Sequence, residues 1–287
     1  MVSLIYFRTF ILRPQREAIL SEPIIRWLTW VWIVQIVSGG LWLWIATAQM
    51  SDDSLLGVLD FGVMRTVLEQ TQFGQLWFCR MGPALVQGII LVVAYRRNFL
   101  SCEKSLWLWI AIGLSLLLLI SLAWAGHAAS GTHDRTWHIG IDVFHLAIAS
   151  VWPIGLIPLA VFLWTLPEFL PASELKYVIL SLSRFSNTSV VAVTLLFLTG
   201  LTNAWFFIPS ISALFTSTYG KLLLGKVILF SIMVGLGALN RFWHLPELEA
   251  VGSRISFIRL RKVVLIESML GVIVLLIVGL MGMTAPP

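Results

Sequence analysis

The chain has 287 residues, of which 59% are hydrophobic and only 11% are charged, and its mean hydropathy is +0.93. A soluble domain carries about a quarter charged residues, so this composition excludes a soluble protein and indicates an integral membrane protein. The net charge of +5 does not indicate nucleic-acid binding, because most basic residues lie in short connections between apolar runs. None of these runs shows the alternating pattern of a membrane β-barrel.

Seven uncharged or nearly uncharged runs are each close to the ~20 residues that cross a hydrocarbon core. In chain order they cover residues 26–47, 76–95, 105–125, 138–164, 185–208, 219–240 and 263–283. The sequence therefore predicts an all-α fold, a polytopic transmembrane helical bundle of about seven spans. Residues 1–25 are apolar only to Leu12 and then basic, so we interpret them as a cytoplasmic amphipathic segment before a transmembrane domain at 26–287.

Lysine and arginine are distributed unevenly between the two sides of this arrangement. Fourteen of the 19 basic residues fall on the side of the amino terminus, including five between residues 241 and 262. The positive-inside rule therefore places the amino terminus in the cytoplasm and the carboxyl terminus outside.

Four of the five histidines lie in a stretch from Gly126 to Gly155 that enters the fourth span from the outside: His127, His133, His138 and His145. On a helix that turns 100° per residue, His138, Asp142 and His145 lie within about 60° of one another. An ionisable side chain inside a bilayer is costly unless it is satisfied, so this stripe is a candidate functional site.

The spacing of the stripe limits how it could bind a metal ion. His138 and His145 are separated by roughly 10 Å along the helix, which disfavours one shared ion, whereas Asp142 can pair with either. His127, just beyond the preceding span, could add a ligand from across the hairpin. We therefore favour a metal site of His127, Asp142 and His145, with His138 as an outer partner. The alternative is that Asp142 orients a histidine within a network of hydrogen bonds between helices.

Two further sets of residues complete the candidates. Imidazole suits copper, zinc and iron, and thioether sulfur favours Cu(I). Three methionines near the outer face are therefore candidate outer copper ligands: Met50, Met281 and Met283. A second set of polar residues inside or near the spans could form either a polar pathway or a structural network: Lys226, Asn203, Arg184, Asn240, Arg241 and Glu267.

Several motifs in this order resemble those of the CopD family of bacterial copper-resistance membrane proteins, over roughly residues 25–287. They are QMSDDS at 49–54, TQFGQLWFCR at 71–80, GHAA at 126–129, DVFHLAIASVW at 142–152, RFS at 184–186, TGLTNA at 199–204, YGKLLLGK at 219–226, NR at 240–241, Glu267 and Pro286–Pro287.

In two respects the chain departs from the family. The family usually has Trp-x-Gly-Gly where this chain has Trp152-Pro153-Ile154-Gly155, and we expect this change to alter helix packing below the site. The family also tends toward eight spans, so a chain whose first span is represented only by residues 1–12 looks truncated at its start.

The resemblance implies a multi-pass protein of the inner membrane of a Gram-negative cell. It implies that the protein takes a copper ion from the periplasm and moves it toward the cytoplasm. His127, Asp142 and His145 match the polar positions of the family, and a periplasmic chaperone of the CopC type is a candidate partner.

Two other functions remain open at this stage, and no enzyme motif is visible. A haem-binding electron-transfer protein of the cytochrome b561 type needs histidine pairs at matching depth on facing helices. Only His127 with His138 or His145 could form such a pair. The third function is that of a membrane partner for a periplasmic copper chaperone, without transport.

Overall fold

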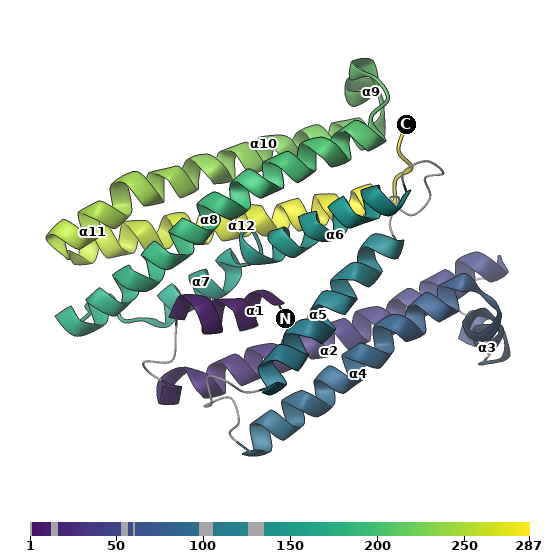
Figure 1. Ribbon diagram of the computed structural model, residues 1–287, viewed down its shortest axis with the longest axis horizontal. Helices are drawn as coiled ribbons and strands as arrows, with labels where there is room; N and C mark the ends of the chain where they lie inside the picture. Colours follow the sequence, from purple (N-terminus) through teal and green to yellow (C-terminus); the bar gives the residue numbers. More distant parts are fainter. Residues whose placement is uncertain (1, 13–16, 53–56, 60, 98–105, 126–134) are drawn as a thin grey trace. The chain divides into compact units, whose positions relative to one another are not determined.

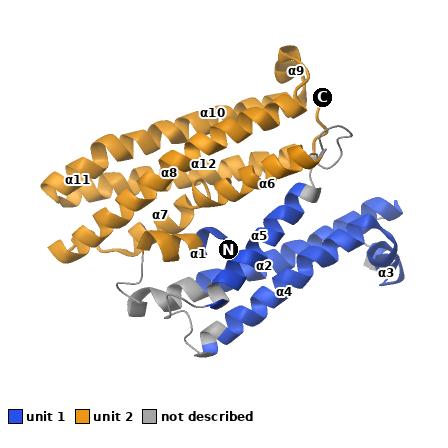
Figure 2. Cartoon of the chain, in the orientation of Figure 1, with its two compact units in different colours: residues 1–5, 14–125 blue, residues 6–13, 126–287 orange. Residues whose placement is uncertain are grey.

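The computed structural model describes the whole chain except residues 1, 13–16, 53–56, 60, 98–105 and 126–134 (Figure 1). The described residues form helices and no strand, which confirms the predicted all-α fold. Contacts divide the chain into two compact units, residues 1–5 with 14–125 and residues 6–13 with 126–287 (Figure 2). Each unit is described by itself below.

Six helices in the described chain are long and apolar enough to cross a membrane. They cover Arg26–Ser51, Gln72–Val93, Thr136–Thr165, Ala172–Phe207, Thr218–Val251 and Arg254–Gly282, and each contains most or all of one predicted span. The remaining predicted span, 105–125, coincides with a helix at Leu106–Ala125, of which Trp109–Ala123 counts as a shorter apolar helix. The chain therefore has the polytopic helical architecture that its composition predicts.

The first unit packs three long helices, which are α2 (Glu17–Ser51), α4 (Gln72–Arg97) and α5 (Leu106–Ala125). Two short elements, η2 (Gly57–Leu59) and α3 (Phe61–Gln70), join α2 to α4. α2 runs without a break across residue 25, and the division of the chain into residues 1–25 and 26–287 stays a prediction.

Polar side chains cross the interior of the first unit in one chain of hydrogen bonds. The Gln35 amide donates to the Gln87 side-chain oxygen at 3.4 Å, and the Gln87 amide donates to the Ser115 hydroxyl at 2.8 Å. Gln87 is 1% exposed, so the network satisfies a buried amide that would otherwise be costly between spans. These contacts explain why α2, α4 and α5 pack together.

The second unit is a bundle around α6 (Arg135–Val151), α8 (Ala172–Phe207), α10 (Thr218–Leu239) and α12 (Arg254–Gly282). Helix α6 packs on α8, and α12 packs on α10 and on α7 (Leu156–Thr165). Helix α9 (Ile211–Thr216) lies at the end of the unit that holds the start of α6 and the end of α12, and α11 (Leu245–Val251) lies at the other end (Figure 1). Of the short elements that open the chain, α1 (Val2–Tyr6) and η1 (Phe7–Leu12), η1 packs on α8.

The predicted span 138–164 is not one helix but two, α6 and α7, separated by a turn at residues 152–155. Pro153 has no amide hydrogen to donate, and the helix stops at its position. A Cβ atom at Gly155 would collide with the carbonyl group of Val151, so the turn needs glycine there. On the facing helix α12, a Cβ atom at Gly271 would lie 3.1 Å from the Pro153 carbonyl oxygen. Helix α12 thus approaches the break through its glycine, and the expectation that Trp152-Pro153-Ile154-Gly155 alters packing relative to the family stays a prediction.

A cluster of charged side chains joins the connection between α7 and α8 to α12. Arg254 and Arg261 both donate to the carboxylate of Glu168, and the Arg261 guanidinium lies 4.4 Å from the Trp164 ring centre. The hydrogen bond from Arg254 holds the pKa of the exposed Glu168 carboxyl below its usual value. Exposed ion pairs contribute little to stability, so we interpret this cluster as fixing geometry at the α11 end of the bundle.

Candidate functional site

The three polar residues predicted to share a stripe on α6 do face the neighbouring helices of the second unit. Asp142 and His145 contact side chains of α8, and both interact electrostatically with Lys226 on α10. His138 lies one turn before Asp142 and interacts electrostatically with it. We call His138, Asp142, His145, Asn203 and Lys226 the outer cluster.

The hydrogen bonds of His145 fix the tautomer of its ring. Its Nδ1 atom lies 2.8 Å from the Thr199 hydroxyl oxygen. That hydroxyl has a single hydrogen, which it donates to the Leu195 carbonyl oxygen at 2.7 Å. With its hydrogen on the Leu195 carbonyl, the hydroxyl accepts a hydrogen bond from Nδ1–H of His145. In the neutral imidazole this leaves the lone pair on Nε2, which is the arrangement that a metal-binding histidine needs.

The carboxylate of Asp142 is held by one neutral donor, and a cation lies close by. The Asn203 amide nitrogen donates to Oδ1 of Asp142 at 3.1 Å, and Lys226 supplies the nearby positive charge. The amide oxygen of Asn203 is buried and has no hydrogen-bond partner. Asp142 and Asn203 therefore present oxygen acceptors that the chain itself does not fully satisfy.

His138 lies at the start of α6 against aromatic rings from the end of α8. Its ring centre is 4.4 Å from that of Phe206, in a stacked arrangement, and 4.7 Å from that of Phe207. The side chain is 6% exposed, and its Nε2 atom is buried without a hydrogen-bond partner. A buried nitrogen of this kind costs free energy unless something binds it, which suits a transient outer ligand.

The outer cluster as described is rich in acceptors but is not a complete metal cage. Among the described residues, no three His, Cys, Asp or Glu side chains lie close enough to hold one ion. The predicted set of His127, Asp142 and His145 stays a prediction, because His127 lies outside the described residues. The three described histidines, His138, His145 and His244, are not paired across facing helices, so no haem pair is seen in this part of the chain.

The candidate methionines differ in their surroundings. Met281 is 8% exposed near the end of α12, and Met283 follows that helix with 85% exposure. The carboxyl-terminal end of α12 lies at the end of the second unit where α6 begins (Figure 1). Met50, at the end of α2 in the first unit, is half exposed. Their role as copper ligands stays a prediction.

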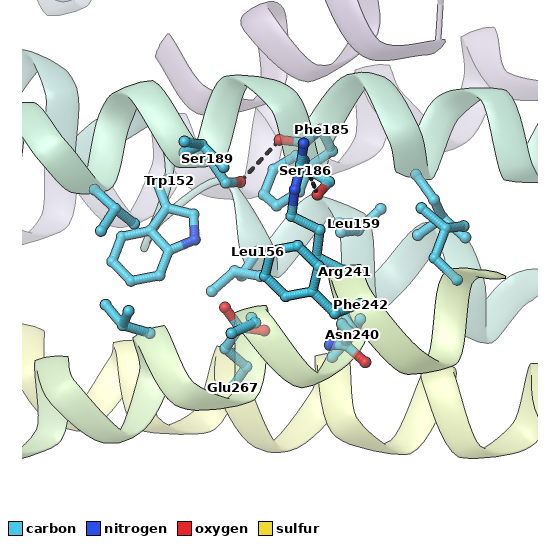
Figure 3. A pocket seen from close by; sticks show the side chains of 18 of the residues that line it. Trp152, Leu156, Leu159, Phe185, Ser186, Ser189, Asn240, Arg241, Phe242 and Glu267 are labelled. Atoms are coloured by element: carbon cyan, nitrogen blue, oxygen red, sulfur yellow. Dashed lines mark hydrogen bonds between the residues drawn. The ribbon is translucent and has the colours of Figure 1, made fainter. Parts of the chain in front are cut away.

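A second polar site lies deeper in the second unit, where α8, α10 and α12 enclose a cavity of about 340 Å³ (Figure 3). Most of its wall is apolar, and Glu267 and Arg241 are the two charged residues among the described residues that line it. Asn240 and Arg241 reach it from a π-helical segment, η5 (Asn240–His244), that continues α10. We call this the inner cavity.

Glu267 on α12 is 2% exposed and has Asn240 and Trp152 as hydrogen-bonding neighbours. Arg241 donates instead to the Ser186 hydroxyl at 2.7 Å and to the Asn187 side-chain oxygen at 2.9 Å, both on α8. Arg184 points elsewhere and donates to the Ile11 carbonyl oxygen of η1 at 3.2 Å. Of the residues predicted to form a polar pathway or structural network with Glu267, the structure brings Asn240 to the carboxyl group, whereas Arg184 ties η1 to α8.

Three residues of these sites were not singled out from the sequence. Thr199, which fixes the ring of His145, and Tyr219, which interacts electrostatically with Asp142, belong to the TGLTNA and YGKLLLGK motifs. Trp152, beside Glu267, ends the DVFHLAIASVW motif. A hydroxyl group or an indole ring is uncharged, so hydropathy does not mark it as functional within an apolar run. Membership in these family motifs is the sequence feature that could have identified the three residues.

Comparisons with known proteins agree with this architecture. Two family models match, Copper resistance protein D-like, N-terminal domain, over residues 4–136, and Copper resistance protein D, over residues 179–281. Copper resistance protein D of Pseudomonas syringae pv. tomato is 31% identical over 77% of this chain and 71% of its own length. No solved structure matches the chain.

Two further comparisons point the same way. Copper transport protein CutJ of Bacillus subtilis (strain 168) is 32% identical over 62% of this chain, which spans about a third (32%) of that longer protein. Inner membrane protein YebZ of Escherichia coli (strain K12) is 29% identical over 76% of this chain and 70% of its own length. None of these three names is that of an enzyme. With its membrane-spanning helices and these matches, the chain belongs to the copper resistance protein D family of membrane proteins.

Proposed function

We propose that the protein binds copper at the outer cluster, on the periplasmic side of a bacterial inner membrane, and carries it toward the cytoplasm. The observation that carries this proposal is the hydrogen bond between Nδ1 of His145 and Thr199, which leaves Nε2 as the metal-binding nitrogen of a side chain one turn after Asp142 on α6. The buried Nε2 atom of His138 and the buried amide oxygen of Asn203 have no hydrogen-bond partner, and a bound cation would supply one. Imidazole and carboxylate ligands suit several metals, and the family matches favour copper among them.

Residues spaced seven apart along two helices support a route for copper from the outer cluster to the inner cavity. His138 and His145 on α6 and Trp152 directly after it are seven residues apart, and so are Lys226 and Met233 on α10 and Asn240 at the start of η5. Residues spaced in this way lie on one face of a helix. Met233, halfway along its stripe, is 0% exposed and carries a soft thioether. Two of the polar residues predicted as a pathway, Lys226 and Asn240, are thus spaced to share one face of α10 and its continuation η5.

Copper uptake into cells tests transport and its direction together. Cells that lack their own copy of the protein should accumulate more copper when they express the wild-type chain than when they express the His145→Ala variant at equal abundance. Lower cellular copper with the wild-type chain would indicate export and would overturn the inward direction. Equal copper in the two strains would overturn transport by this site.

Topology is a separate prediction of the same proposal. In a background without the exposed Cys79 and without Cys102, single cysteines would be placed at two exposed positions, Ser212 in α9 and Glu249 in α11. An impermeant thiol reagent added to spheroplasts should label Ser212→Cys only, because the 241–262 connection carries the basic residues that stay in the cytoplasm. Labelling of Glu249→Cys alone would reverse the orientation.

The position of Lys226 makes a further prediction about copper affinity. Its ammonium group interacts with Asp142 and His145, so it opposes the binding of a second cation there. Lys226→Met should raise copper affinity by on the order of tenfold, the equivalent of about 1.4 kcal/mol. Lys221→Met, an exposed change one and a half turns earlier on α10, is the control. Weaker copper binding in Lys226→Met would mean that the lysine supports the site rather than opposing the ion.

A further inference from the structure

Glu267 is a buried carboxyl group that the outer copper site does not use. It lies five residues beyond Lys262, about 7.5 Å further along α12, and is 2% exposed. Its hydrogen-bonding neighbours, the Asn240 amide and the Trp152 indole, are neutral. The ion pairs of the described chain involve Glu69, Glu168 and Glu247, and Glu267 forms none of them. The negative charge of Glu267 therefore has no direct counter-ion in this part of the structure.

The charged groups around the inner cavity explain why that charge stays unpaired. From η5, Arg241 is the one other charged residue of the described wall, and its guanidinium is bound to two side chains of α8 (Figure 3). The wall residues from α8 and α10 are apolar or carry only hydroxyl groups, and Trp152 covers the side of α6. An unpaired carboxylate in such surroundings is costly, and binding a proton removes the cost.

The cavity also offers a way for protons to reach this carboxyl group. The side-chain oxygen of Asn240 and Nδ1 of His244 are both buried without a hydrogen-bond partner, and both belong to the π-helical segment η5. π-Helical turns inside helices occur frequently at functional sites. Of these two residues, Asn240 lines the cavity, and a volume of about 340 Å³ with this unsatisfied oxygen in its wall has room for water, which can pass protons along.

From this geometry we propose that Glu267 is a proton-binding site within the membrane, and that it exchanges its proton with the cytoplasm through the inner cavity. The cytoplasmic direction follows from the basic residues between 241 and 262, which border η5. The proposal that Glu267 binds a proton does not depend on copper binding by the protein. The idea that this proton drives copper movement rests on the proposed function.

Carbodiimide labelling tests the proton site directly. Dicyclohexylcarbodiimide, an apolar reagent, takes the proton of a carboxylic acid onto its nitrogen while the carboxylate oxygen adds to its central carbon. The wild-type protein in lipid vesicles would be treated at a series of pH values, and the modified peptides would be mapped by mass spectrometry. We expect modification at Glu267 that falls as the pH rises, because the reaction consumes the protonated acid. The exposed Glu249 should stay unmodified and serves as the internal control.

Two variants complete the design. Glu267→Gln should lose the modification, and Glu249→Gln should keep it at the wild-type level. Absence of label on Glu267 at every pH, or labelling independent of pH, would overturn the proposal without any need for a variant. Copper titration of the same preparation separates the two hypotheses. Intact copper binding without labelling refutes only the proton site, and labelling without copper binding refutes only the copper site.

Discussion

His145→Ala is expected to abolish copper binding to the purified protein, with a loss of affinity of at least about 100-fold. Changes in residues that only orient a metal ligand typically cost about 10–100-fold. Removal of the ligand itself should cost more, because it deletes the nitrogen that would bind the ion rather than a group that only orients it. Asp142→Ala should have an effect of the same order. Equilibrium copper titration at fixed pH, with metal analysis of the protein, measures both variants.

Matched controls separate loss of a ligand from loss of structure. His244→Ala removes a histidine at the other end of α10 and should leave copper affinity unchanged. Thr199→Val removes the hydroxyl that holds the His145 ring and should weaken binding by about tenfold, less than loss of the ring. Wild-type affinity and stoichiometry in His145→Ala would place the site elsewhere, with the outer methionines as the next candidates.

Glu267→Gln is expected to lower both stability and copper uptake, and Glu249→Gln neither. A glutamine amide keeps the shape of the carboxyl group, but it brings a donor toward the donors of Asn240 and Trp152. One buried polar group left without a partner costs about 1–3 kcal/mol, whereas a surface change away from such contacts stays within about 0.5 kcal/mol. Uptake should fall to about a tenth or less if the proton bound by Glu267 is needed for movement through the bundle.

Thermal unfolding in detergent and copper uptake at matched abundance measure the two effects separately. A stability loss with normal uptake would make Glu267 a structural residue, and equal behaviour of the two variants would contradict the prediction. Glu249 is a suitable match because it is exposed in α11, outside the wall of the inner cavity.

The sequence predicts the spans well because burial in lipid demands long apolar runs, and such runs are visible without any tertiary information. It also predicts that Asp142 and His145 face inward, since a polar stripe inside a membrane must meet other protein. It does not predict Thr199 as the neighbour of His145, or Trp152 as the neighbour of Glu267. Those contacts depend on which helices pack together, and packing between spans leaves little trace in hydropathy.

Two other features show where sequence patterns stop being informative. A single run at 138–164 hides the division into α6 and α7, because Pro153 and Gly155 are as uncharged as the residues around them. Arg184 and Arg241 look alike as basic residues near the same span ends. In the structure, Arg184 donates to the carbonyl oxygen of Ile11, whereas Arg241 lines the inner cavity. This difference depends on the fold and is not visible in the sequence.

The break between α6 and α7 has a consequence for how the protein is assembled during synthesis. Irregular backbone at membrane depth is tolerated only where protein covers it, because lipid tails cannot satisfy its polar groups. At Pro153 the covering surface is Gly271, on the last helix of the chain. When α6 and α7 leave the ribosome, that helix has not yet been translated. The interrupted span must therefore wait in the insertion machinery, or against α8, until the carboxyl-terminal span arrives.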